Sequence, residues 1–97
     1  MTRLLVTVRA LDDIDRLCDF LADHLPHEAA RTAQLIAQGL EILKVHPLVG
    51  RPSGHGMREL VISRGKSGYL ALYIYDNDAD AVSVLAVRHQ REAGYQD

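Results

Sequence analysis

The sequence predicts an α+β domain in which a strand and two helices precede three further strands. Three observations support this fold class: a β-branched run near the start, two stretches with apolar residues at helical spacing, and three later strand-like runs. The expected order is β-α-α-β-β-β, with an N-terminal helical hairpin packed on a mostly antiparallel sheet. The 97 residues suit one domain, spanning 1–97, and not two.

The first strand and the first helix come at the start of the chain. Residues 4–8 form an apolar, β-branched run that predicts a strand. Asp12 and Asp13 follow as candidate N-caps, and the helix should end near His24 because Pro26 disfavours helical geometry at the residue before it. The apolar residues recur at helical spacing: Ile14, Leu17, Cys18, Leu21 and Leu25. The other acids are expected to face solvent: Asp15, Asp19 and Asp23.

The second helix is expected to begin around His27 and Glu28 and to stop before Pro47. Its buried stripe should comprise the apolar residues at helical spacing: Ala29, Ala33, Ile36, Leu40 and Leu43. Gly39 lowers the stability of a helix by about 1 kcal/mol relative to alanine. Its presence therefore suggests close packing against the first helix. Only a few residues link the two helices, so they should form an antiparallel hairpin.

The second half of the chain predicts a loop over residues 46–56 and then an antiparallel meander. Its strands are expected at 57–62, 68–75 and 81–89, joined by short turns at 64–67 and 76–80. Simple alternation divides the last strand into two faces: Val82, Val84, Ala86 and Arg88 on one, and Ser83, Leu85, Val87 and His89 on the other. Both faces are largely apolar, so we expect the helices to cover one and a partner chain the other.

Composition narrows the class of protein. The formal net charge of −2 argues against coating nucleic acid through bulk charge, and 47% hydrophobic with 25% charged residues is typical of a folded soluble domain. Residues 1–9 hold too short an apolar run for a signal peptide or a membrane span, which predicts a cytoplasmic protein without membrane contact. The single cysteine, Cys18, excludes an internal disulfide and is expected to be a buried, inert thiol.

No cofactor or metal is expected. His24 and His27 flank Pro26, so they do not form a helical pair of metal ligands, and the lone cysteine adds no cluster. The glycines at 50, 54 and 56 precede a strand, which is the wrong context for a Walker or dinucleotide-binding loop.

Positive charge gathers in the second half of the chain. The cations there could form one surface suited to phosphates or to an acidic segment of a protein partner: Arg51, Arg58, Arg64, Lys66, Arg88 and Arg91. The alternative is a scattered, solvated set of side chains.

The segment that closes the chain carries the most enzyme-like group. His89 stands beside Arg88, and Tyr95 follows a few residues later. Histidine serves as a general acid or base, arginine stabilises charge that develops on phosphate, and tyrosine stacks on a base. A structural alternative has His89 ending a strand and Tyr95 packing the tail onto the sheet.

Several segments in this order resemble the RelE/ParE toxin superfamily. They are the predicted β-α-α-β-β-β order and residues 47–52, 58–62, 67–73 and 88–92, which read PLVGRP, RELVI, SGYLALY and RHQRE. The resemblance covers almost the whole chain. It implies a cytoplasmic bacterial toxin neutralised by a cognate antitoxin, whose gene is expected as an adjacent small reading frame. It also implies contact with operator DNA only through that antitoxin.

The superfamily divides by target. RelE-like members cut messenger RNA in the ribosome with basic residues and a C-terminal tyrosine, whereas ParE-like members inhibit DNA gyrase. Here Leu70 stands where RelE-type nucleases have an arginine, and His89 stands where another is expected. The resemblance therefore favours a ParE-like gyrase inhibitor of plasmid-stabilisation type.

Two alternatives stay open at this point. One is a ribosome-dependent endoribonuclease in which His89 is the acid or base, Arg58 and Arg88 bind phosphate, and Tyr95 stacks on a base. The other is a non-toxic binding module with the same fold.

Overall fold

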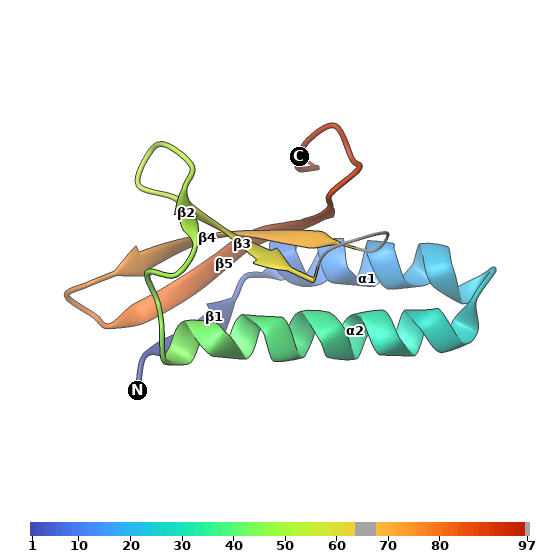
Figure 1. The fold of residues 1–97 in the computed structure, drawn as a ribbon, viewed down its shortest axis with the longest axis horizontal. Coiled ribbons are helices and arrows are strands. Elements are labelled where there is room, and N and C mark those ends of the chain that lie inside the picture. Colours follow the sequence, from blue (N-terminus) through green and yellow to red (C-terminus); the bar gives the residue numbers. More distant parts are fainter. Residues whose placement is uncertain (64–67, 97) are drawn as a thin grey trace.

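In the computed structural model, which describes residues 1–63 and 68–96, two antiparallel helices lie along one face of a five-stranded sheet (Figure 1). In chain order the elements are β1 (Arg3–Val6), α1 (Val8–Ala22), α2 (Pro26–Glu41), the short 3₁₀ helix η1 (Ile42–Lys44), β2 (Arg51–Pro52), β3 (Arg58–Ile62), β4 (Tyr69–Asp76) and β5 (Ala81–His89). The strand order is β1-β5-β4-β3-β2, with β1 parallel to β5 and the other pairs antiparallel. The predicted class and element order are confirmed, with the two-residue β2 as an addition. The turn expected at 64–67 lies outside the described residues.

The N-cap of helix α1 lies five residues before the candidate cap at Asp12. Thr7 is its N-cap, and the Thr7 hydroxyl accepts a hydrogen bond from the Ala10 amide at 3.2 Å. The prediction of a cap at Asp12 or Asp13 was therefore wrong. A threonine hydroxyl can accept from the unpaired amides of a first helical turn as an aspartate carboxylate does. Asp12 and Asp13 lie in the second turn of α1.

Helix α2 begins with Pro26 at its first helical position, where the missing amide hydrogen costs nothing. Its buried stripe runs through Thr32, Ile36, Leu40 and, in η1, Leu43. Ala33, expected in this stripe, is exposed, because Thr32 lies four residues before Ile36 and so shares its face. Gly39 faces the sheet rather than α1: a Cβ placed there would lie 2.7 Å from Ile62 Cγ2.

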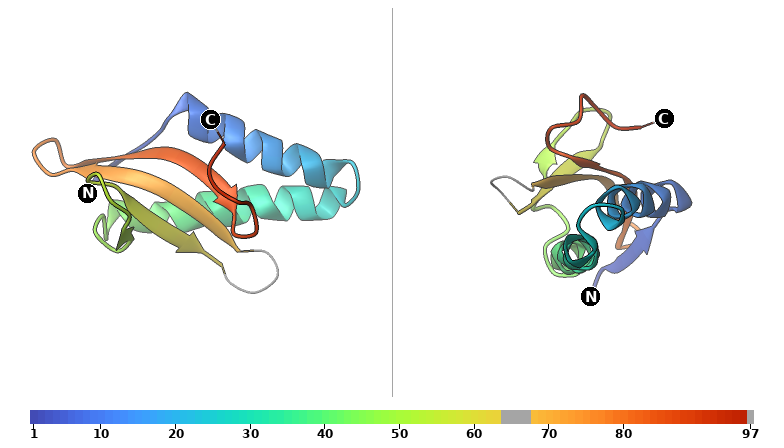
Figure 2. Two further views of the ribbon diagram at one scale, coloured as in Figure 1. Left: turned by 90° about the horizontal axis from the view of Figure 1, so that it is seen from above. Right: turned by 90° about the vertical axis from the view of Figure 1, so that its right-hand side faces the viewer.

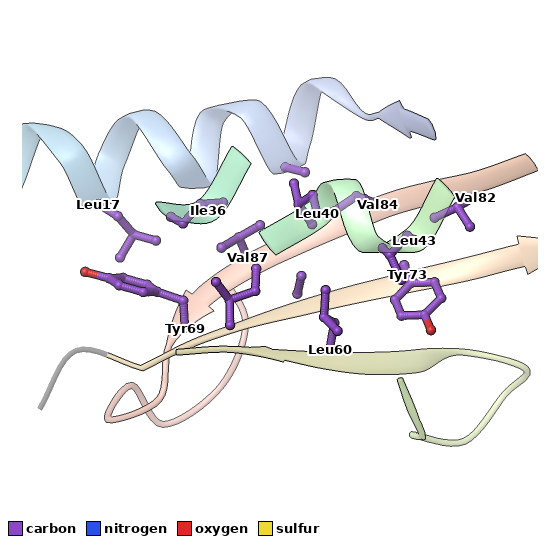
Figure 3. Packing of buried hydrophobic residues seen from close by; sticks show 13 residues of the cluster. Leu17, Ile36, Leu40, Leu43, Leu60, Tyr69, Tyr73, Val82, Val84 and Val87 are labelled. Carbon is purple, nitrogen blue, oxygen red and sulfur yellow. The ribbon is translucent and has the colours of Figure 1, made fainter. Parts of the chain in front are cut away.

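The hydrophobic core lies between the helices and one sheet face (Figure 3). Leu17, Ile36, Leu40 and Leu43 from the helical layer meet a sheet face built around buried Tyr73. Strand β4 turns Tyr69, Ala71 and Tyr73 toward the helices, so the aromatic face of β4 is the covered one. Cys18 is half-buried, and burial, with the charges of Asp15 and Asp19, raises the pKa of its thiol.

A bulge in β5 overturns the simple alternation expected for that strand. Leu72 pairs with Ala86 and Tyr73 pairs with Val84, which leaves Leu85 as the extra residue. Val87 consequently joins Val82 and Val84 in the core, and the following residues change sides as well. The sequence carries no glycine at this point that would have signalled the bulge.

The outer edge of β5 is closed by side chains where β1 ends. The β1–β5 pairing stops at Val6 and Val84. Beyond it the Val87 amide donates to Asp13 Oδ2 and the His89 amide donates to Glu92 Oε1, both at 2.9 Å. Two carboxylates thus replace a neighbouring strand, which protects an otherwise open sheet edge.

The sheet face away from the helices is covered in part by the chain itself. The end of the C-terminal segment, around Tyr95, and the loop that carries β2 lie over it (Figures 1 and 2). Leu70 and Ala86 on this face are 6% and 1% exposed. The expected partner chain is therefore not needed to bury these two residues. Within the described residues, no helix is long and apolar enough to cross a membrane.

Candidate functional site

Four polar side chains meet on the sheet face away from the helices. We call them the open-face cluster: Arg51 from β2, Glu59 from β3, Arg88 from β5 and Tyr95 from the C-terminal segment. The Tyr95 hydroxyl donates to Glu59 Oε2 at 2.6 Å, and Arg51 Nε donates to Glu59 Oε1 at 3.0 Å. The Arg88 guanidinium lies 5.2 Å from the centre of the Tyr95 ring, within cation–π range. Glu59 is the hub that connects the strands to the tail.

The cluster holds Glu59 as a carboxylate. Burial raises the pKa of the Glu59 carboxyl, but hydrogen bonds from Tyr95 and Arg51, with the positive charges of Arg51 and Arg88, outweigh it and leave the pKa below its ordinary value. For Tyr95, burial and the adjacent carboxylate both raise the pKa of the hydroxyl. Tyr95 is therefore a neutral hydrogen-bond donor here, and its proton is committed to Glu59.

His89 lies on the other side of the sheet. Its ring packs edge-to-face on Tyr69, with the centroids 5.2 Å apart and the planes at 88°, and its Nδ1 accepts the Arg91 amide at 3.1 Å. Because Tyr69 belongs to the core face, His89 faces the helices while its neighbour Arg88 faces Tyr95. The structure thus brings Arg88 and Tyr95 together and separates His89 from both.

The other sequence-predicted cations lie in different places. Arg58 Nη1 donates to the carbonyls of Leu48 and Gly50 at 3.2 and 2.8 Å, so this arginine fastens a loop. Arg91 is exposed near the helices. Arg64 and Lys66 lie outside the described residues. Of the six cations proposed as one basic surface, Arg51 and Arg88 share the open-face cluster.

A groove of about 530 Å³ opens on the helix side, where the helical hairpin extends past the ends of β4 and β5 (Figure 1). We call it the hairpin groove. Its walls are mainly apolar, and exposed Phe20 and Leu25 line it together with Leu17, Leu21 and Tyr69. Its polar lining comprises Arg16, Glu28, Thr32, His89, Arg91 and Glu92.

Side-chain contacts rather than regular structure hold the C-terminal segment. Arg16 of α1 forms an ion pair with Glu92 at 3.2 Å, and Arg88 Nη1 donates to the Glu92 carbonyl at 2.6 Å. Arg9 Nη2 donates a hydrogen bond to the Gln96 carbonyl. Burial raises the pKa of the Glu92 carboxyl, but hydrogen bonds from the His89 amide and Gln96, with the charge of Arg16, bring it below the ordinary value.

Acidification should therefore release the C-terminal segment. The folded-state pKa values of Glu59 and Glu92 lie below their ordinary value of 4.5, so their stabilising effect is complete above that value. It is lost as the pH falls through the folded-state values. Hydrogen exchange of the amides in residues 90–96, corrected for intrinsic rates, should show falling protection below about pH 4.5. Protection that stays constant down to about pH 3 would mean that these carboxylates do not hold the segment.

Sequence reasoning did not single out three residues that organise these sites. Glu59, Arg16 and Glu92 make the contacts that join β3, α1 and the tail. The signal for Glu59 was an acid inside a strand, on the face opposite Leu60 and Ile62. Within the described residues no three histidine, cysteine, aspartate or glutamate side chains gather as a metal site.

Comparisons with known proteins identify relatives of this arrangement. A family model, the ParE toxin of type II toxin-antitoxin system, parDE, matches residues 4–94. Toxin RelE3 of Caulobacter vibrioides is 36% identical over 85 residues, which are 87% of this chain and 89% of that protein. Toxin RelE1 of the same organism is 39% identical over 70 residues, 72% of this chain and 75% of that protein.

Solved structures share the fold. A chain of the chromosomal ParDE system from P. aeruginosa aligns with a TM-score of 0.76 and 24% identity, covering 92% of this chain and 96% of that one. A chain of the intact E. coli RelBE toxin-antitoxin complex aligns with a TM-score of 0.60 and 18% identity, covering 95% and 100%. The fold likeness, the family model over almost the entire chain and the curated relatives agree with the resemblance in the sequence. This chain belongs to the ParE toxin family of type II toxin-antitoxin systems, within the RelE/ParE superfamily.

Proposed function

We propose that this protein is a toxin that binds and inhibits DNA gyrase and that a cognate antitoxin neutralises it. The observation that supports this proposal best is the separation of His89 from Arg88 and Tyr95 by the sheet. A toxin that acts by binding needs no shared catalytic centre, whereas a nuclease does.

The geometry argues against cleavage by the predicted nuclease residues. A general acid or base must come within hydrogen-bond reach of the group whose proton it moves, and the same phosphodiester must meet the stabilising cation. His89 packs on Tyr69 beside the helices, while Arg88 covers the Tyr95 ring on the far face. One phosphate cannot meet both side chains in this arrangement.

The charge of the open-face cluster also weakens the case for a nuclease site. Glu59 places a carboxylate between Arg51 and Arg88, whose charges help to keep the Glu59 pKa low, so two cations and one anion leave the cluster with a net charge of +1 at neutral pH. A carboxylate repels a phosphate and offsets part of the attraction of the two arginines. The Tyr95 hydroxyl and one side of its ring are also engaged, by Glu59 and Arg88, which leaves less of the ring for stacking on a base.

The hairpin groove suits the proposed antitoxin. Its apolar walls match the apolar side of an amphipathic segment, and Arg16 and Arg91 offer partners for acids on such a segment. The structural neighbours come from toxin–antitoxin systems, which supports a cognate antitoxin as a partner of this chain.

Cleavage of messenger RNA on the ribosome is the second candidate function. The two curated relatives carry the name RelE, and Arg88 and Tyr95 do lie together on the open face. In that case Tyr95 and Arg88 would act without His89.

Two assays with the purified protein distinguish the candidates. We expect it to inhibit the supercoiling of relaxed plasmid by gyrase and to leave messages intact in a translating extract. The His89→Ala variant should inhibit gyrase as the wild type does, because inhibition by binding needs no general acid or base. Unaltered supercoiling together with messages cut at codon boundaries would reject the proposal in favour of the nuclease.

A further inference from the structure

The turn between η1 and β2 presents a cluster of apolar side chains to solvent. Val45, Leu48 and Val49 are 62%, 57% and 52% exposed. With His46 and Pro47 they border a shallow hollow of about 370 Å³. We call residues 45–49 the knuckle. Single exposed hydrophobic residues are ordinary, but three within five consecutive positions form a patch of the kind found at protein interfaces.

Hydrogen bonds to the core and to β3 hold the knuckle in one shape. The Val49 amide donates to the His46 carbonyl at 3.2 Å. The next residue, Gly50, donates its amide to the Tyr73 hydroxyl at 2.8 Å, and Tyr73 is fully buried beside Leu43 in the core (Figure 3). Arg58 Nη1 donates to the Leu48 and Gly50 carbonyls at 3.2 and 2.8 Å.

Gly50 is required by this anchoring. A Cβ at that position would lie 2.6 Å from the Tyr73 hydroxyl oxygen and 3.0 Å from the Glu59 carbonyl. The backbone therefore approaches the core tyrosine as closely as a glycine allows. The apolar side chains of the knuckle are thus exposed on a fixed backbone, which reduces the entropy lost when a partner binds.

The charged and apolar residues around the knuckle indicate what kind of partner would bind it. Residues 41–59 contain three cations, Lys44, Arg51 and Arg58, and two acids, Glu41 and Glu59, which gives a local net charge of +1. Lys44 pairs with Glu41 and Arg51 pairs with Glu59. The Arg51 side chain is 63% exposed. Apolar side chains with cations beside them fit an apolar pocket rimmed by carboxylates on a folded protein. Nucleic acid would use the cations but would gain little from three aliphatic side chains.

The knuckle is distant from the hairpin groove. The groove includes residues on either side of the start of α2, such as Leu25 and Glu28, whereas the knuckle follows the end of that helix. Helix α2 has 16 residues, which correspond to about 24 Å at 1.5 Å per residue. A concave groove suits a flexible amphipathic segment, and a rigid projection suits a preformed pocket. The two features therefore suit two different partners.

We infer that the knuckle is the surface through which this toxin docks into an acidic, apolar pocket on its folded target protein. This inference rests on the proposed function for the identity of the target, which is then gyrase. The proposed antitoxin occupies the hairpin groove, near the opposite end of α2.

Two variants test this assignment. Leu48→Ser with Val49→Ser removes apolar surface from the knuckle, and the matched control Phe20→Ser removes it from the hairpin groove, where Phe20 is 71% exposed. Each should keep the wild-type urea midpoint, since the side chains changed are exposed. We expect the knuckle variant to need at least tenfold more protein for half inhibition of gyrase and to bind the product of the adjacent small reading frame as the wild type does. Phe20→Ser should show the reverse pattern.

The remaining outcomes each decide the question. Undiminished gyrase inhibition by the knuckle variant overturns the inference, and so does weakened binding of the adjacent gene product by this variant alone. Gel filtration in which the variant dissociates a wild-type dimer would assign the knuckle to a second copy and overturn it too. Loss of plasmid binding measured without gyrase would assign the knuckle to nucleic acid.

Failure of the proposed function is separable from failure of this inference. If the wild type leaves gyrase untouched, the proposed target is wrong, and growth after induced expression tests the knuckle by itself. Retained growth arrest by Leu48→Ser with Val49→Ser then overturns the docking surface. Loss of arrest by the folded variant supports it for another folded target.

Discussion

Replacing Asp13 by alanine should lower the free energy of unfolding by about 2 kcal/mol, the cost of leaving a buried donor without its charged acceptor. Asp13 is 4% exposed, and its Oδ2 accepts the Val87 amide at 2.9 Å. Since β1 pairs no further than Val84, this carboxylate takes the place of a strand at the edge of β5. For a domain of this size the melting temperature should fall by roughly 8–16 °C.

The neighbouring acid provides the control for this prediction. Asp12 is exposed on the same helix, so Asp12→Ala should change the free energy of unfolding by less than about 0.5 kcal/mol. Asp13→Asn should fall between the two, because its amide oxygen still accepts but carries no charge. Equal urea midpoints for Asp12→Ala and Asp13→Ala would show that the edge of β5 does not depend on Asp13.

The second large effect concerns the hydrogen bond between Tyr95 and Glu59. We expect Tyr95→Phe and Glu59→Ala each to destabilise the fold by about 1–3 kcal/mol, because a hydrogen bond to a carboxylate is among the stronger kinds. The two losses should not add: the double variant should be more stable than the sum predicts by about 1–2 kcal/mol. Urea unfolding of the four proteins measures this coupling.

A second tyrosine with a carboxylate partner serves as the comparison. The Tyr75 hydroxyl donates to Asp80 at 2.9 Å on the exposed β4–β5 hairpin. Tyr75→Phe should cost less than about 0.5 kcal/mol, since water replaces the lost partner there. If the losses caused by Tyr95→Phe and Glu59→Ala are additive, the hydrogen bond between Tyr95 and Glu59 contributes nothing to the free energy of unfolding. Other contacts must then hold the C-terminal segment.

The sequence predicted most of the fold because the spacing of apolar residues distinguishes helices from strands even when side-chain contacts are unknown. Apolar residues at helical spacing, among them Ile36 and Leu40, located α2, and the alternating run from Tyr69 to Tyr75 located β4. The limits of β5 were predicted to the residue. Short turns between successive strands then left few topologies open.

What the sequence did not predict depends on contacts between distant residues. Thr7 and Asp13 are both reasonable helix caps, and only the place where β1 ends makes one a cap and the other an edge acceptor. The bulge at Leu85 reverses the direction of every later side chain in β5, and no local residue type announces it.

The three residues considered as a catalytic group do not lie together, and part of the reason is local. His89, Arg88 and Tyr95 are close in sequence, but the alternation along β5 sends the first two to opposite faces. Glu59 joins the cluster from β3 through tertiary pairing that no spacing in the chain encodes. The family resemblance rested on the order of segments, and the comparisons confirm it.

The topology of a reporter plasmid in growing cells tests the central claim most directly. After induction of the toxin without antitoxin, we predict growth arrest with a relaxed plasmid and full-length messages. The His89→Ala variant should give the same result. Normally supercoiled plasmid alongside messages cut during translation would contradict this account, and unimpaired growth would contradict any toxic activity of the chain.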